Sequence, residues 1–276
     1  MECKSQSAME YLMTYGWAIL IIAVVLGVLF QLGIFSGSSL TPKAQPGSCE
    51  VLRTVAATSL EGLCQGQLPQ FVAQFNGQTS WVSIPTLMQP QSHSFIAWME
   101  SSSYTAYDPL FFVLGQWNAR VLVHGTIQLS RDGGGGVDSG VTPNPNQWYE
   151  VAITINSIKV ASIYVNGVLK ATGTPPSQTE NWNGGAFVGF DQYNNWYFNG
   201  QLADIQIYNT TLNGNEISAS YLEGVGGAPV QLQNLVGWWP LNGNLNDYSG
   251  NNNNGSEFAG NQISFNGTWT SSYTTP

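Results

Sequence analysis

Short alternating segments separated by turn residues fill positions 71–208 and constrain the fold more than any other feature of the chain. Apolar and polar residues alternate in several of these segments, as in strands with one buried face. Asn76-Gly77, Asn166-Gly167 and Gly125 predict three hairpins. The predicted strands cover residues 71–75, 81–84, 94–99, 110–114, 120–124, 126–130, 148–155, 162–165, 168–170, 186–190 and 202–208. No strongly amphipathic helix interrupts them, so the pattern predicts an all-β sandwich of two sheets.

Charged residues are scarce. The chain has 7 Lys+Arg and 16 Asp+Glu, a formal net charge of −9, and only 8% of its 276 residues are charged. A typical soluble domain has about 25%. So few cations cannot neutralise a phosphate backbone, which argues against a nucleic-acid partner. The apolar content of 43% is too high for a disordered chain. The composition instead fits a secreted or surface protein rich in strands.

A long apolar run lies near the N-terminus. No charged residue occurs between Glu10 and Lys43, and residues 16–35 are apolar apart from Gln31. A helix over residues 11–35 would be roughly 37 Å long, which exceeds the roughly 30 Å hydrocarbon core of a bilayer. The sequence therefore predicts a membrane-spanning helix.

The residues before this run, Lys4-Ser5-Gln6-Ser7-Ala8-Met9-Glu10-Tyr11, resemble the class III signal of archaeal type IV pilin-like proteins. The resemblance implies that a class III signal peptidase cleaves between Ser5 and Gln6. Residues 1–5 would then be a leader, residues 6–36 the pilin-like helix, and Glu10 the fifth residue of the mature chain. A carboxylate beside an apolar helix needs a partner. A neighbour's N-terminal ammonium group would supply one and set the stagger of a filament; alternatively, Glu10 simply lies in water.

Residues 37–68 are predicted to link the helix to the body, because small residues and two prolines follow the apolar run. This linker contains Cys49 and Cys64, which we expect to form a disulfide outside the cell. The alternative is two free thiols. The apolar patch at 51–60 is compatible with either a strand or a helical turn.

Five segments resemble, in order, the concanavalin A-like, laminin-G-like (LamG) jelly roll of the lectin/glucanase superfamily. They are FNGQTSWVSIP, SFIAWM, NQWYEVAITI, IYVNGVLKATG and FNGQLADIQIYNTTLNGNEISASYLEG, at residues 75–85, 94–99, 146–155, 163–173 and 198–224. The resemblance implies a jelly-roll domain over residues 69–224, with a short helix that starts near the Glu-Ile pair of the last segment.

The usual first strand of such domains is missing before the sandwich, and its counterpart, LVGWWPLNG, appears afterwards at residues 235–243. The resemblance implies that first and last strands lie side by side. The C-terminal segment 225–276 is therefore predicted to complete the sheet through residues 236–241, as a circular permutation. Two alternatives remain. The segment could complete a neighbouring subunit's sheet. It could also be a truncated second repeat, because residues 265–267 have the same sequence, Phe-Asn-Gly, as residues 75–77.

No catalytic constellation is evident. Glycosidases of the superfamily need two carboxylates that flank the scissile bond, yet Glu150 and Asp204 each stand alone in their predicted strands. His93 and His124 are the only histidines, and neither lies in a nucleophile-like context. The sequence therefore predicts a protein that is not an enzyme.

Two loops have the composition of a sugar-binding surface, in which aromatic rings stack on sugar faces and polar groups bind hydroxyls. One loop holds Trp182, and the other holds Asp191, Tyr193, Asn194 and Trp196. Alternatively, the tryptophans only pack on the sandwich edge. The predicted function is an archaeal pilin-like protein that displays a LamG domain at the cell surface for adhesion or glycan recognition. A structural filament subunit and a membrane-tethered glycan hydrolase are the alternatives.

The resemblance to this jelly-roll family also implies a Ca²⁺ ion, for which Asp204 and Asp247 are the candidate ligands. Asp204 could instead fix the adjacent turn by a hydrogen bond. Asn209, Asn254 and Asn266 each begin a glycosylation sequon, which suits a surface protein.

Overall fold

A computed structural model describes residues 8–31, 42–87, 90–104, 108–113, 119–131, 135–175, 185–257 and 262–276. The chain divides into two compact units, Met1–Thr41 and Pro42–Pro276.

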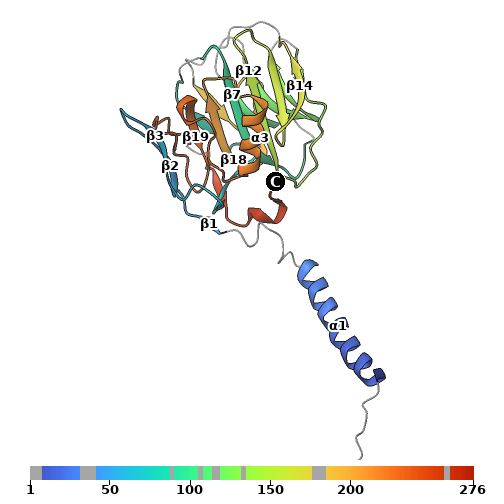
Figure 1. The fold of residues 1–276 in the computed structure, drawn as a ribbon. Coiled ribbons are helices and arrows are strands. Elements are labelled where there is room, and N and C mark those ends of the chain that lie inside the picture. Colours follow the sequence, from blue (N-terminus) through green and yellow to red (C-terminus); the bar gives the residue numbers. More distant parts are fainter. Residues whose placement is uncertain are drawn as a thin grey trace, which may run out of the picture. The chain divides into compact units, whose positions relative to one another are not determined.

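The first unit contains helix α1 (Ala8–Gln31), where the sequence predicts a helix (Figure 1). Residues 15–28 are all apolar and all exposed. Nevertheless, none of the helices in the described ranges is long and apolar enough to cross a membrane. The predicted membrane crossing therefore has no support here. Ser5 and Gln6, together with the side chain of Glu10, lie outside what the structure describes.

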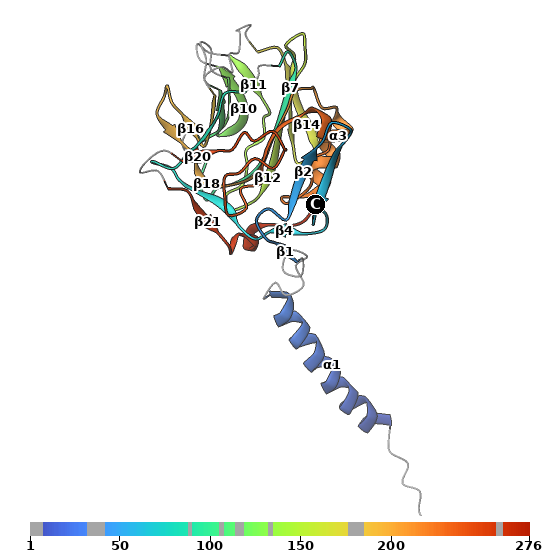
Figure 2. The same ribbon diagram turned by 90° about the vertical axis from the view of Figure 1, so that its left-hand side faces the viewer.

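The second unit is a sandwich of two antiparallel sheets (Figures 1 and 2). The seven-stranded sheet has the order β11-β10-β9-β8-β15-β6-β20. Its strands are β6 (Val82–Ile84), β8 (Asp108–Val113), β9 (Ala119–His124), β10 (Thr126–Arg131), β11 (Gly136–Asp138), β15 (Ala186–Val188) and β20 (Ser256–Glu257). The eight-stranded sheet has the order β14-β13-β12-β7-β18-β5-β21, with β19 also paired to β18. Its strands are β5 (Val72–Asn76), β7 (His93–Glu100), β12 (Tyr149–Ile155), β13 (Ala161–Val165), β14 (Val168–Gly173), β18 (Asn199–Tyr208), β19 (Leu235–Trp239) and β21 (Ser264–Asn266).

The main core lies between the two sheets, because alternate residues of each strand point inward. Phe75, Ile84, Leu129, Ile153 and Trp239 belong to this cluster and are all buried. The prediction of an all-β jelly-roll sandwich is confirmed.

Two of the three predicted hairpins are confirmed. Gly125 joins β9 to β10, and Asn166-Gly167 joins β13 to β14, with positive φ at both turn residues. The hairpin predicted at Asn76-Gly77 is wrong, because β5 and β6 belong to different sheets. The Asn76 side-chain oxygen accepts the backbone N–H groups of the next residues, Gln78, Thr79 and Ser80. This loop carries the chain from one sheet to the other instead of folding it back.

The C-terminal segment completes a sheet of its own chain, as predicted. Strand β19 pairs with the second half of β18, from Ile205↔Trp239 to Tyr208↔Leu235, while β5 pairs with the first half. The side-chain amides of Asn251 and Asn253 both donate to the Val236 carbonyl, at 3.0 and 2.9 Å. The outer edge of β19 is thus covered by the loop that follows it, rather than open to a neighbouring strand.

Part of the predicted linker is folded onto the sandwich. Strands β1 (Lys43–Ala44) and β4 (Leu68–Pro69) pair in parallel, and β2 (Cys49–Arg53) forms a hairpin with β3 (Thr58–Gly62). The predicted Cys49–Cys64 disulfide is present. The Arg53 guanidinium donates to three backbone carbonyls, those of Ser249, Leu232 and Leu235, at 2.8–2.9 Å. This hairpin therefore holds the segment that contains β19.

Helix α3 (Gly214–Glu223) covers the outer face of the eight-stranded sheet (Figure 1). It begins where the resemblance places it, with a capping box in which Asn213 and Glu216 satisfy each other's backbone N–H groups. Two of its residues contact outward-facing residues of the sheet. The Ser220 hydroxyl donates to the Glu150 carboxylate, and the Tyr221 ring stacks on Trp98.

Candidate functional site

Hairpin β16–β17 contains four of the five predicted ligand-binding residues; Trp182 is outside the described ranges. Strand β16 (Phe190–Asp191) pairs with β17 (Trp196–Tyr197). Tyr193 is 60% exposed, Asn194 is exposed, and Trp196 is half-buried. The structure thus presents an aromatic and an amide side chain to solvent on one short loop.

Asp191 shapes this loop instead of facing a ligand. Its carboxylate is fully buried, and its Oδ1 accepts the backbone N–H groups of Tyr193 and Asn194 at 3.0 and 3.2 Å. Its Oδ2 accepts the Asn194 side-chain amide at 2.9 Å. A carboxylate that closes a loop in this way fixes the orientation of the exposed residues beside it.

An aromatic stack supports the hairpin. The Phe190 ring lies between the Trp81 and Tyr197 rings, with centroid distances of 5.4 and 4.6 Å and nearly parallel planes. Phe187 meets Trp81 edge-on at 4.8 Å. The sequence did not lead us to assign Trp81, Phe187 and Phe190 to the site. A signal was present, because Phe187 lies between Ala186 and Val188, which face the core, and alternation therefore places it on the opposite face.

The aromatic stack lies on the outer face of the seven-stranded sheet, because Phe187 of β15 faces away from the core. Figure 2 shows β16 on the side of the second unit opposite to α3. The eight-stranded sheet is covered by α3, hairpin β2–β3 and the C-terminal segment. The two faces of the sandwich therefore differ, and the side with the aromatic stack is the better candidate for contact with a ligand.

Two carboxylates do come close together, but beneath α3. Trp98 is the cross-strand partner of both Glu150 and Ala203, the neighbour of Asp204. Glu150 is 0% and Asp204 2% exposed. Burial raises the pKa of Glu150 to about 8 and that of Asp204 to about 7, and Asp204 contributes to the shift of Glu150. Neither carboxylate reaches solvent, so this pair is not placed to act on a sugar.

The arrangement of Asp204 and Asp247 does not fit a calcium site, because protein donors occupy their oxygens. The indole Nε1 of Trp238 donates to Asp204 at 2.7 Å, and its backbone N–H donates to Asp247 at 2.9 Å. Gln206 donates to Asp204, and Ser249 and Asn253 donate to Asp247. Calcium needs about six to eight oxygen ligands, whereas within the described ranges no three metal-ligating side chains cluster. Both aspartates instead lock Trp238 and β19 in place.

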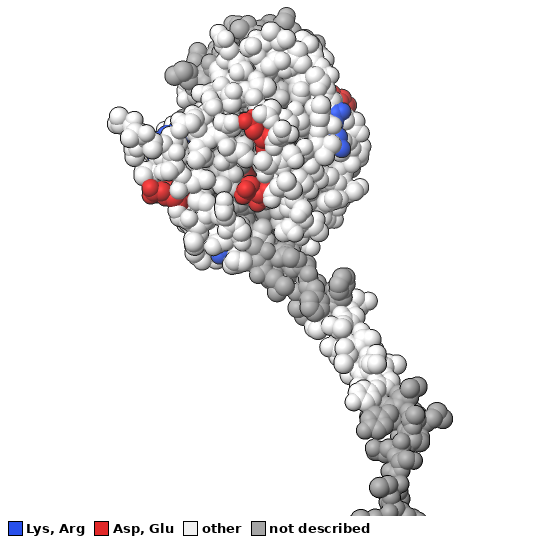
Figure 3. Space-filling model, in the orientation of Figure 1, with Lys and Arg blue, Asp and Glu red and all other residues white. Residues whose placement is uncertain are grey.

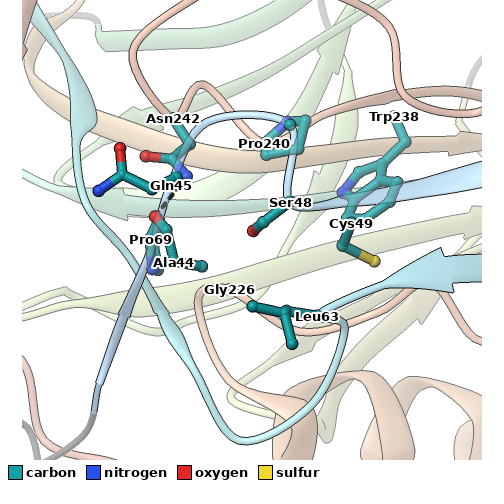
Figure 4. Close-up of a pocket in the computed structure, with 11 residues that line it drawn as sticks. Ala44, Gln45, Ser48, Cys49, Leu63, Pro69, Gly226, Trp238, Pro240 and Asn242 are labelled. Carbon is teal, nitrogen blue, oxygen red and sulfur yellow. Dashed lines mark hydrogen bonds between the residues drawn. The ribbon is translucent and has the colours of Figure 1, made fainter.

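A small pocket next to the disulfide is lined by Ser48, Cys49, Leu63, Trp238, Asn242 and neighbouring residues (Figure 4). Its volume of about 30 Å³ would hold a water molecule but not a sugar ring. Charged side chains on the face that carries α3 form only small, separate patches (Figure 3). Neither feature indicates a ligand site.

The three sequon asparagines differ in accessibility. Asn209 and Asn254 are exposed, and Asn266 is half-buried. Asn209 accepts a hydrogen bond through Oδ1 from Asn234, which leaves the side-chain nitrogen as the atom for a glycan. Asn209 and Asn254 are therefore the more accessible of the three positions.

The chain is similar to several known proteins. Residues 76–218 match the family model of the "Concanavalin A-like lectin/glucanases superfamily". No curated protein is similar enough to count as a relative. A candidate carbohydrate-binding protein from Bacteroides ovatus is 14% identical, with a TM-score of 0.58, over 88% of this chain and 84% of its own. Domain 4 of the Geobacillus stearothermophilus extracellular arabinanase AbnA, solved with arabinotriose, is 16% identical, with a TM-score of 0.44, over 65% and 84%. A SAP-like pentraxin from Limulus polyphemus is 16% identical, with a TM-score of 0.44, over 58% and 84%.

Proposed function

Because the chain belongs to the concanavalin A-like lectin/glucanase superfamily, we propose that its sandwich is a carbohydrate-binding domain whose sugar-contacting element is hairpin β16–β17. The observation that carries this proposal is the exposed Tyr193 on a loop that Asp191 closes and the aromatic stack supports. A rigid aromatic side chain loses little conformational entropy when a sugar stacks on it. The Bacteroides ovatus protein, described as a candidate carbohydrate binder, shares this fold.

The sugar that suits this loop is neutral. Asp191 is the only charged residue between positions 190 and 198, and the loop itself uses its carboxylate. A charged sugar would find no counter-ion there, whereas hydroxyl groups would find amides and an aromatic face. We therefore assign the domain to binding of neutral glycans, not to catalysis. Glu150 and Asp204 are buried beneath α3, where a sugar cannot reach them, and this supports a binding role without hydrolysis.

Replacing Tyr193 with alanine is expected to weaken binding of a neutral oligosaccharide by about 10- to 30-fold, since an aromatic anchor contributes about 1.4–2 kcal/mol. The Trp196→Ala variant should also weaken binding. Isothermal titration calorimetry over a panel of neutral oligosaccharides measures both effects. Leu222→Ala, an exposed substitution on α3, is the control and should leave the affinity unchanged. Equal affinities for Tyr193→Ala and the unchanged protein would show that the hairpin is not the site.

For the first unit we propose a role in display, as the pilin-like helix of a surface filament. Fourteen consecutive exposed apolar residues, 15–28, leave α1 without a buried face of its own. Burial of these side chains against other copies of the helix would remove that surface from water. The disulfide of the second unit is typical of proteins outside the cell. Adhesion through the glycan-binding domain would follow from such display.

The expected result for this display role is a mature N-terminus at Gln6 in material sheared from the cell surface. Mass spectrometry of sheared and membrane fractions measures it. A Glu10→Gln variant should be cleaved equally but assembled less, because it lacks the charge that would set the subunit stagger. An intact Met1 confined to membranes would contradict filament assembly and favour a simple anchor.

A further inference from the structure

We propose that the second units of neighbouring copies contact one another through two different surfaces, the outer face of hairpin β2–β3 on one copy and strand β14 on the next. This inference rests on the proposed filament and adds to it, because it names the surfaces through which the second units meet. A contact between two unlike surfaces can repeat from copy to copy without closing into a pair, as a filament requires.

The outer face of hairpin β2–β3 is both acidic and apolar. Strand alternation places Glu50 and Leu52 of β2 on this face. Their cross-strand partners on β3, Glu61 and Ser59, lie on the same face. All four residues are exposed, and Leu52 is 41% exposed. Val51 points the other way and is buried against the sandwich, so the outer face is directed away from its own chain.

The two carboxylates of this face lie opposite each other without a cation. Glu50 and Glu61 form a cross-strand pair, in which the Cβ atoms are roughly 5 Å apart. Within the described ranges neither carboxylate makes a hydrogen bond or an ion pair. The guanidinium of Arg53 on the same hairpin donates to backbone carbonyls instead. Like charges in this position destabilise a hairpin, so a cation from a neighbouring copy would stabilise it.

Strand β14 has the complementary character. It is an edge strand of the eight-stranded sheet and pairs there with β13. Val168 and Leu169 are 55% and 52% exposed, and Lys170 beside them is also exposed. The register of β13 with β14 skips Lys170, which is therefore the extra residue of a β-bulge. Bulges re-aim side chains at sheet edges, and this one places an ammonium group next to two exposed apolar side chains.

Lys170 also differs from the other cations of the second unit. The Lys and Arg side chains that the structure describes there are Lys43, Arg53, Lys159 and Lys170. The first three donate to backbone carbonyls of their own chain. Lys170 makes no such bond to any described residue. In a chain with a net charge of −9, complementary charge of this kind selects one orientation between copies that otherwise repel each other.

The two surfaces lie at opposite ends of the eight-stranded sheet. Strands β13, β12, β7 and β18 lie between β14 and β19. Hairpin β2–β3 is attached to the segment that contains β19. At about 4.8 Å per strand, β14 and β19 are roughly 24 Å apart. Figure 1 shows β2 and β3 on one side of the second unit and β14 on the other. One copy can therefore use both surfaces at once, each toward a different neighbour.

The contact is small and depends on assembly. A few apolar side chains and one charge bury much less than the roughly 800 Å² per partner of a stable complex. Free second units are therefore expected to stay separate. In a filament, each second unit is linked to an α1 that packs against other copies of the helix. The local concentration then reaches the millimolar range, at which a weak contact forms.

The test is cysteine cross-linking of the full chain on intact cells, with the charged residues left in place. Ser59→Cys and Leu169→Cys put one thiol on each surface. The double variant should form a ladder of dimers, trimers and larger species after mild oxidation. Each single variant should give less than about one tenth of this product, because unlike surfaces meet. Ser59→Cys combined with Asn194→Cys, an exposed position on hairpin β16–β17, is the matched control and should form no ladder.

Charge exchange in the double-cysteine chain tests the pairing itself. Lys170→Glu should reduce the ladder by about fivefold or more, because it places a carboxylate against Glu50 and Glu61 of the next copy. Adding Glu50→Lys and Glu61→Lys to this variant should restore the ladder. Lys170→Arg keeps the charge and should leave the yield unchanged. A ladder that persists in Lys170→Glu would contradict the assigned charge pairing.

Each remaining outcome also decides between the proposals. A dimer formed efficiently by either single-cysteine variant would mean that like surfaces meet, which overturns the inference. Sheared filaments that begin at Gln6 but give no ladder would overturn it too and leave the display role standing. A ladder found only in membranes, on chains that keep Met1, would support the contact and contradict the filament.

Discussion

A chain that ends at Gly224 is expected not to fold into the sandwich. The missing segment supplies nine of the buried apolar side chains, namely Val225, Ala228, Leu235, Trp238, Trp239, Leu241, Ile263, Trp269 and Tyr273. Each buried tryptophan alone is worth about 3–5 kcal/mol on removal, and the whole stability of a domain is about 5–15 kcal/mol. Far-ultraviolet circular dichroism and hydrogen exchange of the truncated chain measure the effect.

Trp238→Ala is the single-residue form of this experiment. It removes a buried ring and leaves the Asp204 oxygen without its indole donor, so the free energy of unfolding should fall by about 4–6 kcal/mol. Trp196→Ala, the same substitution at a half-buried ring, should cost about 1 kcal/mol. If the free energy of unfolding of the unaltered chain rose with protein concentration, the C-terminal segment would complete the sheet of a neighbouring subunit, because only association between chains depends on concentration. An unchanged, cooperative transition in the truncated chain would show that the segment is dispensable.

The folded sandwich is expected to lose stability as the pH rises from 5 to 8.5. Burial raises the pKa of Glu150 from 4.5 to about 8 and that of Asp204 from 3.8 to about 7, so the folded state holds both protons more tightly than the unfolded state. The free energy that these two groups contribute to folding is therefore fully present below about pH 4. It is lost as the pH rises through the pKa values of the folded state. The expected loss for the pair between pH 5 and pH 8.5 is on the order of 6 kcal/mol. Denaturant unfolding at pH 5, 7 and 8.5 measures it.

Glu150→Gln should reduce this pH dependence to the part that Asp204 contributes, because the amide carries no proton to lose and its oxygen can still accept the Ser220 hydroxyl. Tyr208, also buried, has a pKa raised well above 10 by burial and the nearby carboxylates, and so does not titrate in this range. Glu61→Gln, an exposed change, is the control and should preserve the slope. Stability that is constant or increases toward pH 8.5 would contradict this assignment.

Local patterns predicted much of the sandwich. The Asn166-Gly167 turn and the strand around Ile153 could be predicted because alternation and turn chemistry act within a few residues. The displaced LVGWW strand was predicted from the family resemblance alone. Which strands pair with each other was harder to predict from the sequence. Asn76-Gly77 has the residues of a hairpin turn, and only the long-range pairing of β5 with β18 makes it a crossover between sheets.

The candidate site was predicted in part. Tyr193, Asn194 and Trp196 were identified from composition, which is a local property. The buried role of Asp191 depends on how its own loop closes, and the contribution of Trp81 depends on packing against residues more than 100 positions away. The meeting of Glu150 and Asp204 beneath α3 likewise needs three strands in register. Such contacts between distant segments have no signature in a single sequence.

The Cys49–Cys64 bond also determines how the second unit responds to mechanical force. A pull on the chain at Pro42 would first meet the two-residue pairing of β1 with β4 and the hydrogen bond from Lys43 to the Gly267 carbonyl. Beyond these contacts, tension passes directly from Cys49 to Cys64, because the disulfide connects the two ends of the β2–β3 hairpin. The β2–β3 hairpin between the two cysteines is therefore not under tension. The hydrogen bonds from Arg53 to the segment that contains β19 remain intact.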